Sequence, residues 1–418
     1  MSELAVHWLG EESLGDPFRS EWSDLLGGDP EATLFLTPEW TGSWWRHLGS
    51  GILRVLTIRR GARLVCLLPL VERSERIHGV KGRLLEFAGE PEADLLGAVR
   101  DPGDKQALDA AVREISKAAG AVDVVRLSEV ASGSSLDRAL EKASPASGLA
   151  AVRRVCGRAP ILALDGPWDV IEASYPKALR VRLQRARKKQ EKAGGLRFRR
   201  WRPAPDEVAD LLERLRAIEG MKVERRRAEG RRAEGMLVPP RRWAFIQELS
   251  PILAERGWLD VATLEMDGRL VAYRYGFRFR DAFLDYNLAH DPRDDAYSPG
   301  RTLLDEVIRD SHRIELHAVE ASRGSLHPPH LLADWTPISR WHARWTIFGR
   351  SLRGRLLFAM ETRVKPWWRR LRRVAPPAAP VPDLVFRPGR PRGKPVDRSG
   401  PGVEECPAGV ATPRPEDG

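Results

Sequence analysis

The stretch Trp258–Phe279, WLDVATLEMDGRLVAYRYGFRF, carries the clearest structural signal in the chain. Apolar and polar residues alternate on both sides of Asp267-Gly268, a dipeptide preferred in two-residue hairpin turns. The pattern predicts two antiparallel strands, Trp258–Met266 and Arg269–Phe279, joined by that turn. The other predicted elements lie on either side of this hairpin in the sequence.

Toward the C-terminus, a second turn at 280–281 leads into a third strand, Ala282–Ala289, followed by a polar loop at His290–Tyr297. Ser298–Gly300 then begins a predicted helix, because proline is favoured in a first turn. One face of that helix is apolar and carries Leu303, Leu304, Val307 and Ile308. Leu316–Ala321 completes the series as a further strand.

The first half of the chain repeats this order of elements. Its predicted strands, turn, loop and helix are Leu53–Ile58, the turn 60–62, Leu64–Leu70, Leu84–Ala88, a loop that holds Asp94, the helix 104–118 and the strand Val122–Leu127. Pro102-Gly103 precedes the first helix as Pro299-Gly300 precedes the second. We therefore predict an α/β (α+β) fold made of two copies of one unit. Each copy contains a mixed, mostly antiparallel sheet flanked by helices.

The two copies differ at the start of this helix. A helix N-terminus preceded by glycine presents free N–H groups and the positive end of the helix dipole, which together attract a pyrophosphate. The residue after Gly300 is Arg301, which favours an anion, whereas the residue after Gly103 is Asp104, which repels one. We therefore expect a phosphorylated cofactor to bind the second copy. A plain turn is the alternative reading of each Pro-Gly pair.

The net charge of +11 is concentrated in two segments. Between Tyr175 and Arg200, eleven Lys and Arg residues face the single acid Glu191. The segment 350–373 is similarly basic and contains Trp367 and Trp368. Such segments suit a phosphate- or carboxylate-bearing partner, and a solvated helix face is the alternative. The proline-rich tail 375–418 has almost no apolar periodicity, which predicts disorder.

The basic segment 174–193 is predicted to be an amphipathic helix with Ser174 as its N-cap and Pro176 in its first turn. Its buried stripe would comprise Tyr175, Leu179, Leu183 and Ala186. The segment 222–242 contains RRAEG twice in tandem, which indicates a low-complexity insertion and a solvated loop, with a lid as the alternative. Thr37 and Pro38 begin another predicted helix, in which Trp40, Trp44 and Trp45 are core candidates.

The composition excludes several classes of protein. A chain of 418 residues exceeds the usual size of one hydrophobic core, so two to three domains are expected. The sequence has no apolar run that could span a bilayer and no signal-peptide pattern, which predicts a cytoplasmic protein. The cysteines are isolated, and there is no metal-ligand spacing, phosphate-binding P-loop or G-x-S-x-G elbow. No metal and no DNA partner are expected.

Several segments together resemble the GNAT-type acyltransferases of the CelD-like group, which is associated with cellulose biosynthesis and is similar to Fem-type peptidyltransferases. The segments are Phe35–Leu48 (FLTPEWTGSWWRHL), Leu64–Leu70, Leu85–Asp94 (LEFAGEPEAD), Ser174–Arg187 and Phe283–Leu304 (FLDYNLAHDPRDDAYSPGRTLL). The resemblance extends from about Trp8 to about Trp345 and implies tandem GNAT-like units. It also implies acyl transfer from a thioester or aminoacyl carrier to an amine.

The sequence departs from the family pattern after its last core strand. The pattern has an acidic residue, a glycine and then a Tyr-Lys pair, of which only Glu320 and Gly324 have counterparts here. The family lysine is a candidate for stabilising developing negative charge. Arg323, His327 and His330 are the candidates to replace it.

The resemblance assigns roles to individual residues. The donor's pantetheine would pair with backbone near Leu288 and Ala289, and its diphosphate would meet Pro299, Gly300, Arg301 and Thr302. The catalytic candidates are Asp285, Asp94, Glu320 and His290. Asp285 would lie on the same face of its strand as Asn287. The substrate-binding candidates are Glu39, Arg46, Tyr286 and Arg323. For Asp285 a surface ion pair, and for His290 a turn, are the alternatives.

The leading hypothesis is an N-acyltransferase that uses an acyl-CoA and acts on an amine of an amino sugar, a polysaccharide or a cell-envelope precursor. One alternative is a Fem-like peptidyltransferase that uses aminoacyl-tRNA. Another is a non-catalytic protein that binds an anionic membrane or polysaccharide through 175–200 and 350–373, at the inner face of the membrane. The expected domains are 1–160, 161–349, a basic helix at 350–374 and the tail 375–418.

Overall fold

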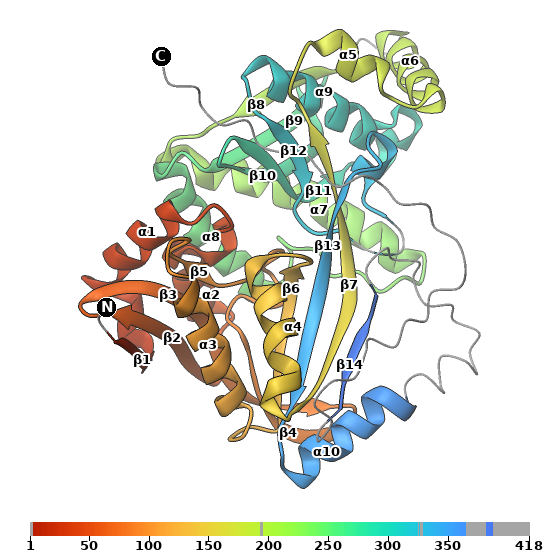
Figure 1. Cartoon of the computed structure of the whole chain (residues 1–418). Coiled ribbons are helices and arrows are strands. Elements are labelled where there is room, and N and C mark those ends of the chain that lie inside the picture. Colours follow the sequence, from red (N-terminus) through yellow and green to blue (C-terminus); the bar gives the residue numbers. More distant parts are fainter. Residues whose placement is uncertain (1–2, 193–194, 325, 327–328, 365–381, 388–418) are drawn as a thin grey trace.

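The computed structural model describes residues 3–192, 195–324, 326, 329–364 and 382–387, which form two similar units (Figure 1). The first unit contains β1 (Leu4–Leu9), α1 (Phe18–Gly28), α2 (Pro38–His47), β2 (Ile52–Arg60), β3 (Arg63–Ile77), β4 (Val80–Phe87), β5 (Val99–Arg100), α3 (Lys105–Ala118), β6 (Val124–Ala131), α4 (Ser135–Ser147) and β7 (Ala150–Ala163).

The second unit follows without a long linker. It contains α5 (Trp168–Ala173), α6 (Lys177–Lys192), β8 (Arg197–Trp201), α7 (Val208–Ala228), α8 (Pro240–Glu255), β9 (Leu259–Met266), β10 (Arg269–Phe279), β11 (Ala282–His290), α9 (Pro299–Arg313), β12 (Ala318–Ala321) and β13 (Ser339–Phe348). The short helix α10 (Leu352–Ala359), the helical turn Met360–Val364 and the strand β14 (Leu384–Phe386) come last.

Both units follow one plan, which confirms the predicted duplication and the α/β class. From β1 in the first unit and from β8 in the second, a strand and two helices are followed by three antiparallel strands, a helix and a parallel strand, and the second unit has α5 and α6 in addition before β8. The parallel pairs are β4 with β6 in the first unit and β11 with β12 in the second. The sequence predicted the middle of this plan and the helix α2, but β1, α1, β8 and α8 were not predicted.

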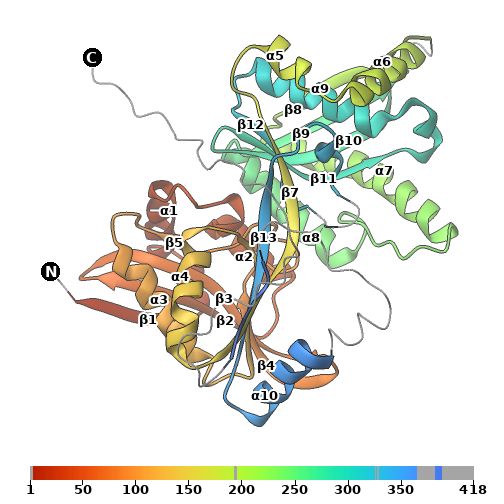
Figure 2. The same ribbon diagram turned by 45° about the vertical axis from the view of Figure 1, so that its right-hand side comes forward.

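The two units exchange their last strands. The sheet order is β1-β2-β3-β4-β6-β13-β7-β12-β11-β10-β9-β8, so β13 of the second unit lies next to β6 of the first. The end of β7, in turn, pairs with β12 of the second unit. Figures 1 and 2 show β7 and β13 running side by side from one unit into the other. The predicted boundary between residues 160 and 161 therefore falls inside a strand.

The predicted hairpin turns are confirmed by their backbone angles. Asp267 and Gly268 have φ values of 51° and 76°, as a type I′ turn requires. Arg280 and Asp281 also have positive φ values, of 50° and 58°, although neither residue is glycine. The left-handed region is costly for such residues, so the second turn is held by the strands on either side of it.

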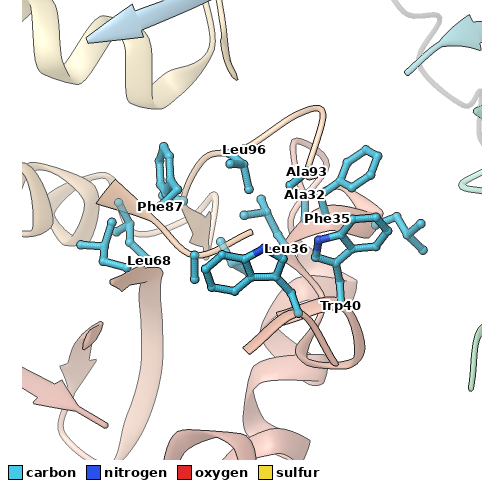
Figure 3. Packing of buried hydrophobic residues seen from close by; sticks show 14 of the residues in the cluster. Ala32, Phe35, Leu36, Trp40, Leu68, Phe87, Ala93 and Leu96 are labelled. Atoms are coloured by element: carbon cyan, nitrogen blue, oxygen red, sulfur yellow. The ribbon is translucent and has the colours of Figure 1, made fainter. Parts of the chain in front are cut away.

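An aromatic cluster joins the two units. Trp40 and Phe35 of the first unit are buried and pack edge-to-face with ring centroids 4.7 Å apart (Figure 3). Trp40 also contacts Phe245 and Phe277 of the second unit, at 5.3 and 6.0 Å. Thr37 caps α2 as predicted, because its hydroxyl accepts a hydrogen bond from Trp40 N–H. Burial of these rings fixes the position of the first unit against α8 and β10.

The basic segment differs from its prediction at the N-terminal end. Ser174 closes the short helix α5, and α6 begins only at Lys177. The helix is interrupted at Tyr175 because the residue before a proline is disfavoured in the α-helical region. The predicted buried stripe is confirmed, since Tyr175, Leu179, Leu183 and Ala186 are all buried.

Two further predictions are corrected. The first RRAEG copy was predicted to be a loop, but α7 continues to Ala228, because arginine, alanine and glutamate are good helix formers. Within the predicted disordered tail, Leu384–Phe386 pairs with β7 as β14, and Asp383 binds Arg154 at 3.2 Å. The rest of that tail, and Trp367 and Trp368 of the predicted basic helix, lie outside the described residues.

Candidate active site

The parallel strands β11 and β12 part near the middle of β11. Their register ends at Asp285 and Ala321, and one further bond follows, from Ser322 N–H to the Asp285 carbonyl at 3.3 Å. The segment Asn287–His290 stays paired with β10, while its other edge has no strand partner among the described residues. Apart from the Leu288 carbonyl, which accepts a hydrogen bond from Lys222, the backbone groups on this edge are therefore available to an extended ligand.

A β-bulge lies at the point where the strands part. Asn287 pairs with Tyr275 and Asp285 with Gly276, so Tyr286 is an extra residue on β11. A Cβ atom at Gly276 would lie 2.4 Å from a backbone oxygen of β11, which explains the glycine. Asp285 and Asn287 were predicted to lie on the same face of β11, and this prediction is wrong. The Asn287 side chain contacts α7, whereas the Asp285 side chain lies on the side of α9.

Asp285 forms a buried ion pair with Arg274, and both side chains are almost fully shielded from solvent. His330 lies 3.4 Å away through its Nε2 atom, and its Nδ1 atom accepts from Leu332 N–H, which leaves the Nε2 proton facing Asp285. Burial alone would raise the pKa of Asp285, but Arg274 and His330 bring that pKa below its ordinary value. Asp285 is therefore held as a carboxylate.

The start of α9 lies beside this ion pair. Ser298 adopts a left-handed conformation at the N-cap, and its side chain makes no capping bond. Arg274 Nη2 donates to the Gly300 carbonyl at 3.0 Å. A Cβ atom at Gly300 would meet only His290 Nδ1, at 3.6 Å, so the first turn of the helix has room beside this residue. An uncapped helix start with room before it fits the diphosphate of a CoA-type donor.

The remaining predicted donor-binding residues are partly engaged elsewhere. Arg301 pairs with Asp334 at 2.6 Å, and the Thr302 hydroxyl accepts from Gln190 of α6 at 2.7 Å. Pro299 is buried, and His290 pairs with Asp295 at 2.7 Å beside the start of α9. The backbone of Gly300 is therefore the more accessible part of the predicted anion seat.

Lys222 was not singled out from the sequence, because it lies in a run rich in charged residues. In the structure it reaches across from α7, and its Nζ atom donates to the Leu288 carbonyl at 2.6 Å. Burial lowers its pKa, and Arg274 and Arg226 act in the same direction, against Glu219. A cation thus lies at the open edge of β11, although the family lysine is absent from the segment after Gly324.

Asp94 enters the same region from the first unit. Its Oδ2 atom accepts from the Ser322 hydroxyl at 2.6 Å, and Arg323 lies 3.9 Å from its Oδ1 atom. Burial raises the pKa of Asp94 to about 7. Arg323 itself is held by the Pro91 carbonyl at 2.7 Å and by Glu129 at 2.8 Å. The structure therefore brings Asp94 next to Ser322, one residue from the parting of the strands.

The other predicted residues have structural partners. Glu39 is buried between Arg19 and Arg256, at 3.2 and 2.6 Å, and Arg46 Nε donates to Glu248 at 2.7 Å. Tyr286 is partly buried and donates to the Glu92 carbonyl at 2.8 Å, and Glu320 pairs with Arg340 at 2.7 Å. Glu39 and Arg46 therefore join the units, since a buried or shared charge requires a partner. His327 lies outside the described residues.

The described part of the chain contains no group of three or more His, Cys, Asp or Glu side chains placed to hold a metal ion. Its helices are all too short or too polar to cross a bilayer.

Comparison with known proteins defines the class of the second unit. Residues 177–327 match the family model described as an acetyltransferase (GNAT) domain. This part of the second unit therefore has the sequence pattern of a GNAT acetyltransferase domain, as the resemblance implied, while the CelD-like group stays a prediction. No curated protein matches the chain in sequence.

Two solved structures share the fold over most of the chain. The crystal structure of FemX aligns with a TM-score of 0.53 at 11% identity and covers 82% of this chain and 98% of that one. The C-terminal domain of a putative lysylphosphatidylglycerol synthetase from Agrobacterium fabrum aligns with a TM-score of 0.50 at 14% identity and covers 82% and 95%. At these identities the likeness concerns the fold alone.

Proposed function

We propose that this protein is an N-acyltransferase that transfers an acyl group from an acyl-CoA-type donor to an amine of an amino sugar, a polysaccharide or a cell-envelope precursor. The observation that carries the proposal is the parting of β11 and β12 next to the uncapped start of α9. A donor laid along the edge Asn287–His290 would direct its diphosphate at Gly300 and its thioester at Asp285 and Ser322.

The residues around the parting supply the chemistry of amine acylation. The acceptor's ammonium must lose a proton before its nitrogen attacks the thioester carbonyl, and the thiol then leaves. Asp94 is suited to accept that proton, because its pKa of about 7 leaves much of it ionised at neutral pH and still basic. Lys222 would stabilise negative charge that develops at the edge of β11, and Arg274 keeps Asp285 ionised.

The proposal is tested by donor binding to Gly300→Asp and Gly300→Ala. Both variants add a Cβ atom that the site accommodates, but only aspartate places a negative charge in the anion seat. Acetyl-CoA and a long-chain acyl-CoA are titrated by calorimetry against the wild type and both variants. We expect binding that Gly300→Ala retains and Gly300→Asp loses. Acyl-CoA binding that is equal in both variants would contradict the proposed seat.

A second candidate is a peptidyltransferase that uses aminoacyl-tRNA, and the position of α6 favours it. The exposed face of α6 is basic, and its C-terminal end contacts the start of α9 through Gln190 and Thr302. Bulk tRNA is therefore included as a ligand, since phosphate contacts weaken steeply with added salt. Salt-sensitive binding of tRNA without acyl-CoA binding would favour this function. Binding of neither would favour a non-catalytic protein that binds anionic membranes or polysaccharides.

A further inference from the structure

A pocket of about 430 Å³ lies between the two units, and Ser322 is one of its lining residues. One wall comes from the first unit and includes Ala32, Phe35, Leu36 and Leu96, which lie close together in Figure 3. The opposite wall comes from the turn between β10 and β11 and from the residues around Ser322. Its volume lies within the usual range of small-molecule sites, about 300–1,000 Å³.

The pocket offers hydrogen-bond donors that the protein leaves unused. Arg100 and Ser132 both line it, and the Arg100 Nε atom and the Ser132 hydroxyl are buried behind this lining without a hydrogen-bond partner among the described residues. Buried polar groups without partners are rare in native proteins and call for an explanation. A ligand with acceptor oxygens would satisfy both groups once these side chains turn toward the pocket.

One of the charged residues that line the pocket, Arg280, has no carboxylate partner among the described residues. Glu31 accepts from the N–H and the hydroxyl of Ser135 and lies 3.9 Å from Arg100 Nη2, and Glu320 pairs with Arg340. Arg280 donates to the Leu26 carbonyl at 2.7 Å, but no carboxylate of the described residues lies within 4 Å of its guanidinium. Asp29 lies near enough for its charge to act on Arg280, but its carboxylate accepts from two backbone N–H groups and not from the Arg280 guanidinium. Arg280 is therefore the cation of the lining that can form an ion pair with an acidic ligand.

Ser322 connects this pocket to the proposed reaction centre. It lines the pocket, its hydroxyl donates to Asp94, and its N–H forms the last bond between the parting strands. A ligand in the pocket would thus lie next to the group proposed to accept the amine proton. A donor along β11 would reach the same point from the other side.

We propose that this pocket binds the acceptor, and that the acceptor is a compact amine carrying one carboxylate or phosphate group next to an apolar or uncharged body. This inference rests on the proposed function. Arg280 and Arg100 would bind the acidic group through charge-assisted hydrogen bonds, and Ser132 would donate to an oxygen of the ligand. The apolar walls would enclose the remainder, with the amine directed at Ser322 and Asp94.

Matched pairs of small amines test the recognition of the acid. Calorimetry compares glucosamine 6-phosphate with glucosamine, and leucine with leucinamide, each on the full chain. We expect the charged member of at least one pair to bind at least tenfold more tightly than its uncharged partner. Preference for the phosphate or for the carboxylate identifies which source supplies the acidic group.

Three variants test the location of the site. Arg280→Gln removes the unpaired cation, and Ser132→Ala removes one unused donor without altering the charge of the pocket. Arg76→Gln is the matched control, because Arg76 is exposed on β3 and does not line the pocket. We expect a tenfold loss of affinity for the bound acid with Arg280→Gln, a smaller loss with Ser132→Ala, and none with Arg76→Gln.

The outcomes separate this inference from the proposed function. If the wild type binds acyl-CoA but neither acid, or binds charged and uncharged partners equally, the acceptor pocket is wrong while the acyltransferase proposal stands. Equal losses with Arg280→Gln and Arg76→Gln would also overturn the site. Binding of an acid that Arg280→Gln weakens, without any acyl-CoA binding, would retain the pocket as an acid-binding site and remove its role as the acceptor site.

Discussion

The helices α3 and α9 occupy equivalent places in the two units, yet their N-termini are built differently. Asp104 caps α3, where its carboxylate accepts from Ala107 N–H at 3.1 Å and pairs with Arg60 at 2.7 Å. The start of α9 has no side-chain cap, and Ser298 is held in a left-handed conformation in front of it. The first unit thus satisfies its helix dipole with its own carboxylate, whereas the second leaves it unneutralised.

The buried carboxylates of the two units differ in a similar way. Asp285 of the second unit has Arg274 as a partner, and its pKa is lowered. Asp94 of the first unit has only a hydroxyl and a more distant arginine, and burial raises its pKa to about 7. In a duplicated fold, differences of this kind indicate which copy binds an anion and which supplies a group able to exchange a proton.

The largest expected effect concerns the buried ion pair of the second unit. Asp285→Ala leaves the Arg274 guanidinium buried without its partner, which should lower the free energy of unfolding by about 3–5 kcal/mol. The double variant Arg274→Met with Asp285→Leu removes both charges and should recover most of that loss. Urea unfolding measures both. A loss below about 1 kcal/mol in the single variant would show that the pair is not buried as described.

The next effect concerns Asp94 and is read from the pH dependence of stability. In the folded protein this carboxyl holds its proton up to about pH 7. An aspartate in the unfolded chain has an ordinary pKa of about 3.9 and releases its proton earlier. The stabilisation from this proton is complete below the unfolded pKa and is lost as the pH rises toward 7.

The wild type should therefore lose up to about 1.4 kcal/mol per pH unit relative to Asp94→Asn between pH 5 and pH 7. Urea unfolding of both proteins at several pH values measures the difference. A difference that stays constant with pH would show that Asp94 has an ordinary pKa.

A smaller effect compares the same charge placed on the two helices. Gly300 and Gln106 occupy the second position of α9 and α3. Gly300→Asp should weaken acyl-CoA binding at least tenfold, which corresponds to about 1.4 kcal/mol, while Gln106→Asp should leave it unchanged. Calorimetric titration of both variants measures this. If Gln106→Asp were the more damaging variant, the donor would belong to the first unit.

The smallest effect concerns the cap of α3. Asp104→Ala removes both the capping bond and the Arg60 pair, and should lower the free energy of unfolding by about 1 kcal/mol. Ser298→Ala at the equivalent position of α9 should change it by much less, because that side chain makes no capping bond. Parallel urea titrations compare the two. Equal losses would mean that Ser298 caps α9 in solution.

Local patterns predicted much of each unit. The turn at Asp267-Gly268, the strand over 282–289, the helix that begins at Pro299 and the Thr37 cap all depend on residues close together in sequence, and the structure confirms them. The contrast between Asp104 and Arg301 compared positions that are not equivalent, because Asp104 is the N-cap of α3 whereas Arg301 is the third residue of α9 and pairs with Asp334.

The remainder depends on contacts that sequence spacing does not reveal. The exchange of β7 and β13 joins residues almost 200 positions apart, and neither strand was predicted. The bulge at Tyr286 changed which faces Asp285 and Asn287 occupy, because one extra residue breaks the period of two. Lys222 reaches Leu288 from a separate helix, and Glu39 and Arg46 looked like cleft residues until their ion partners were seen.

The exchanged strands have a consequence for how this protein can be divided or inherited. A cut between β7 and α5 would give two fragments, each holding a strand that completes the sheet of the other. Either fragment alone would expose the bare edge of β6 or β12, a template for aggregation. We expect co-expressed fragments to associate and single fragments to precipitate; soluble single fragments would contradict this. Loss or replacement of one half of the gene would therefore disrupt the fold of both units.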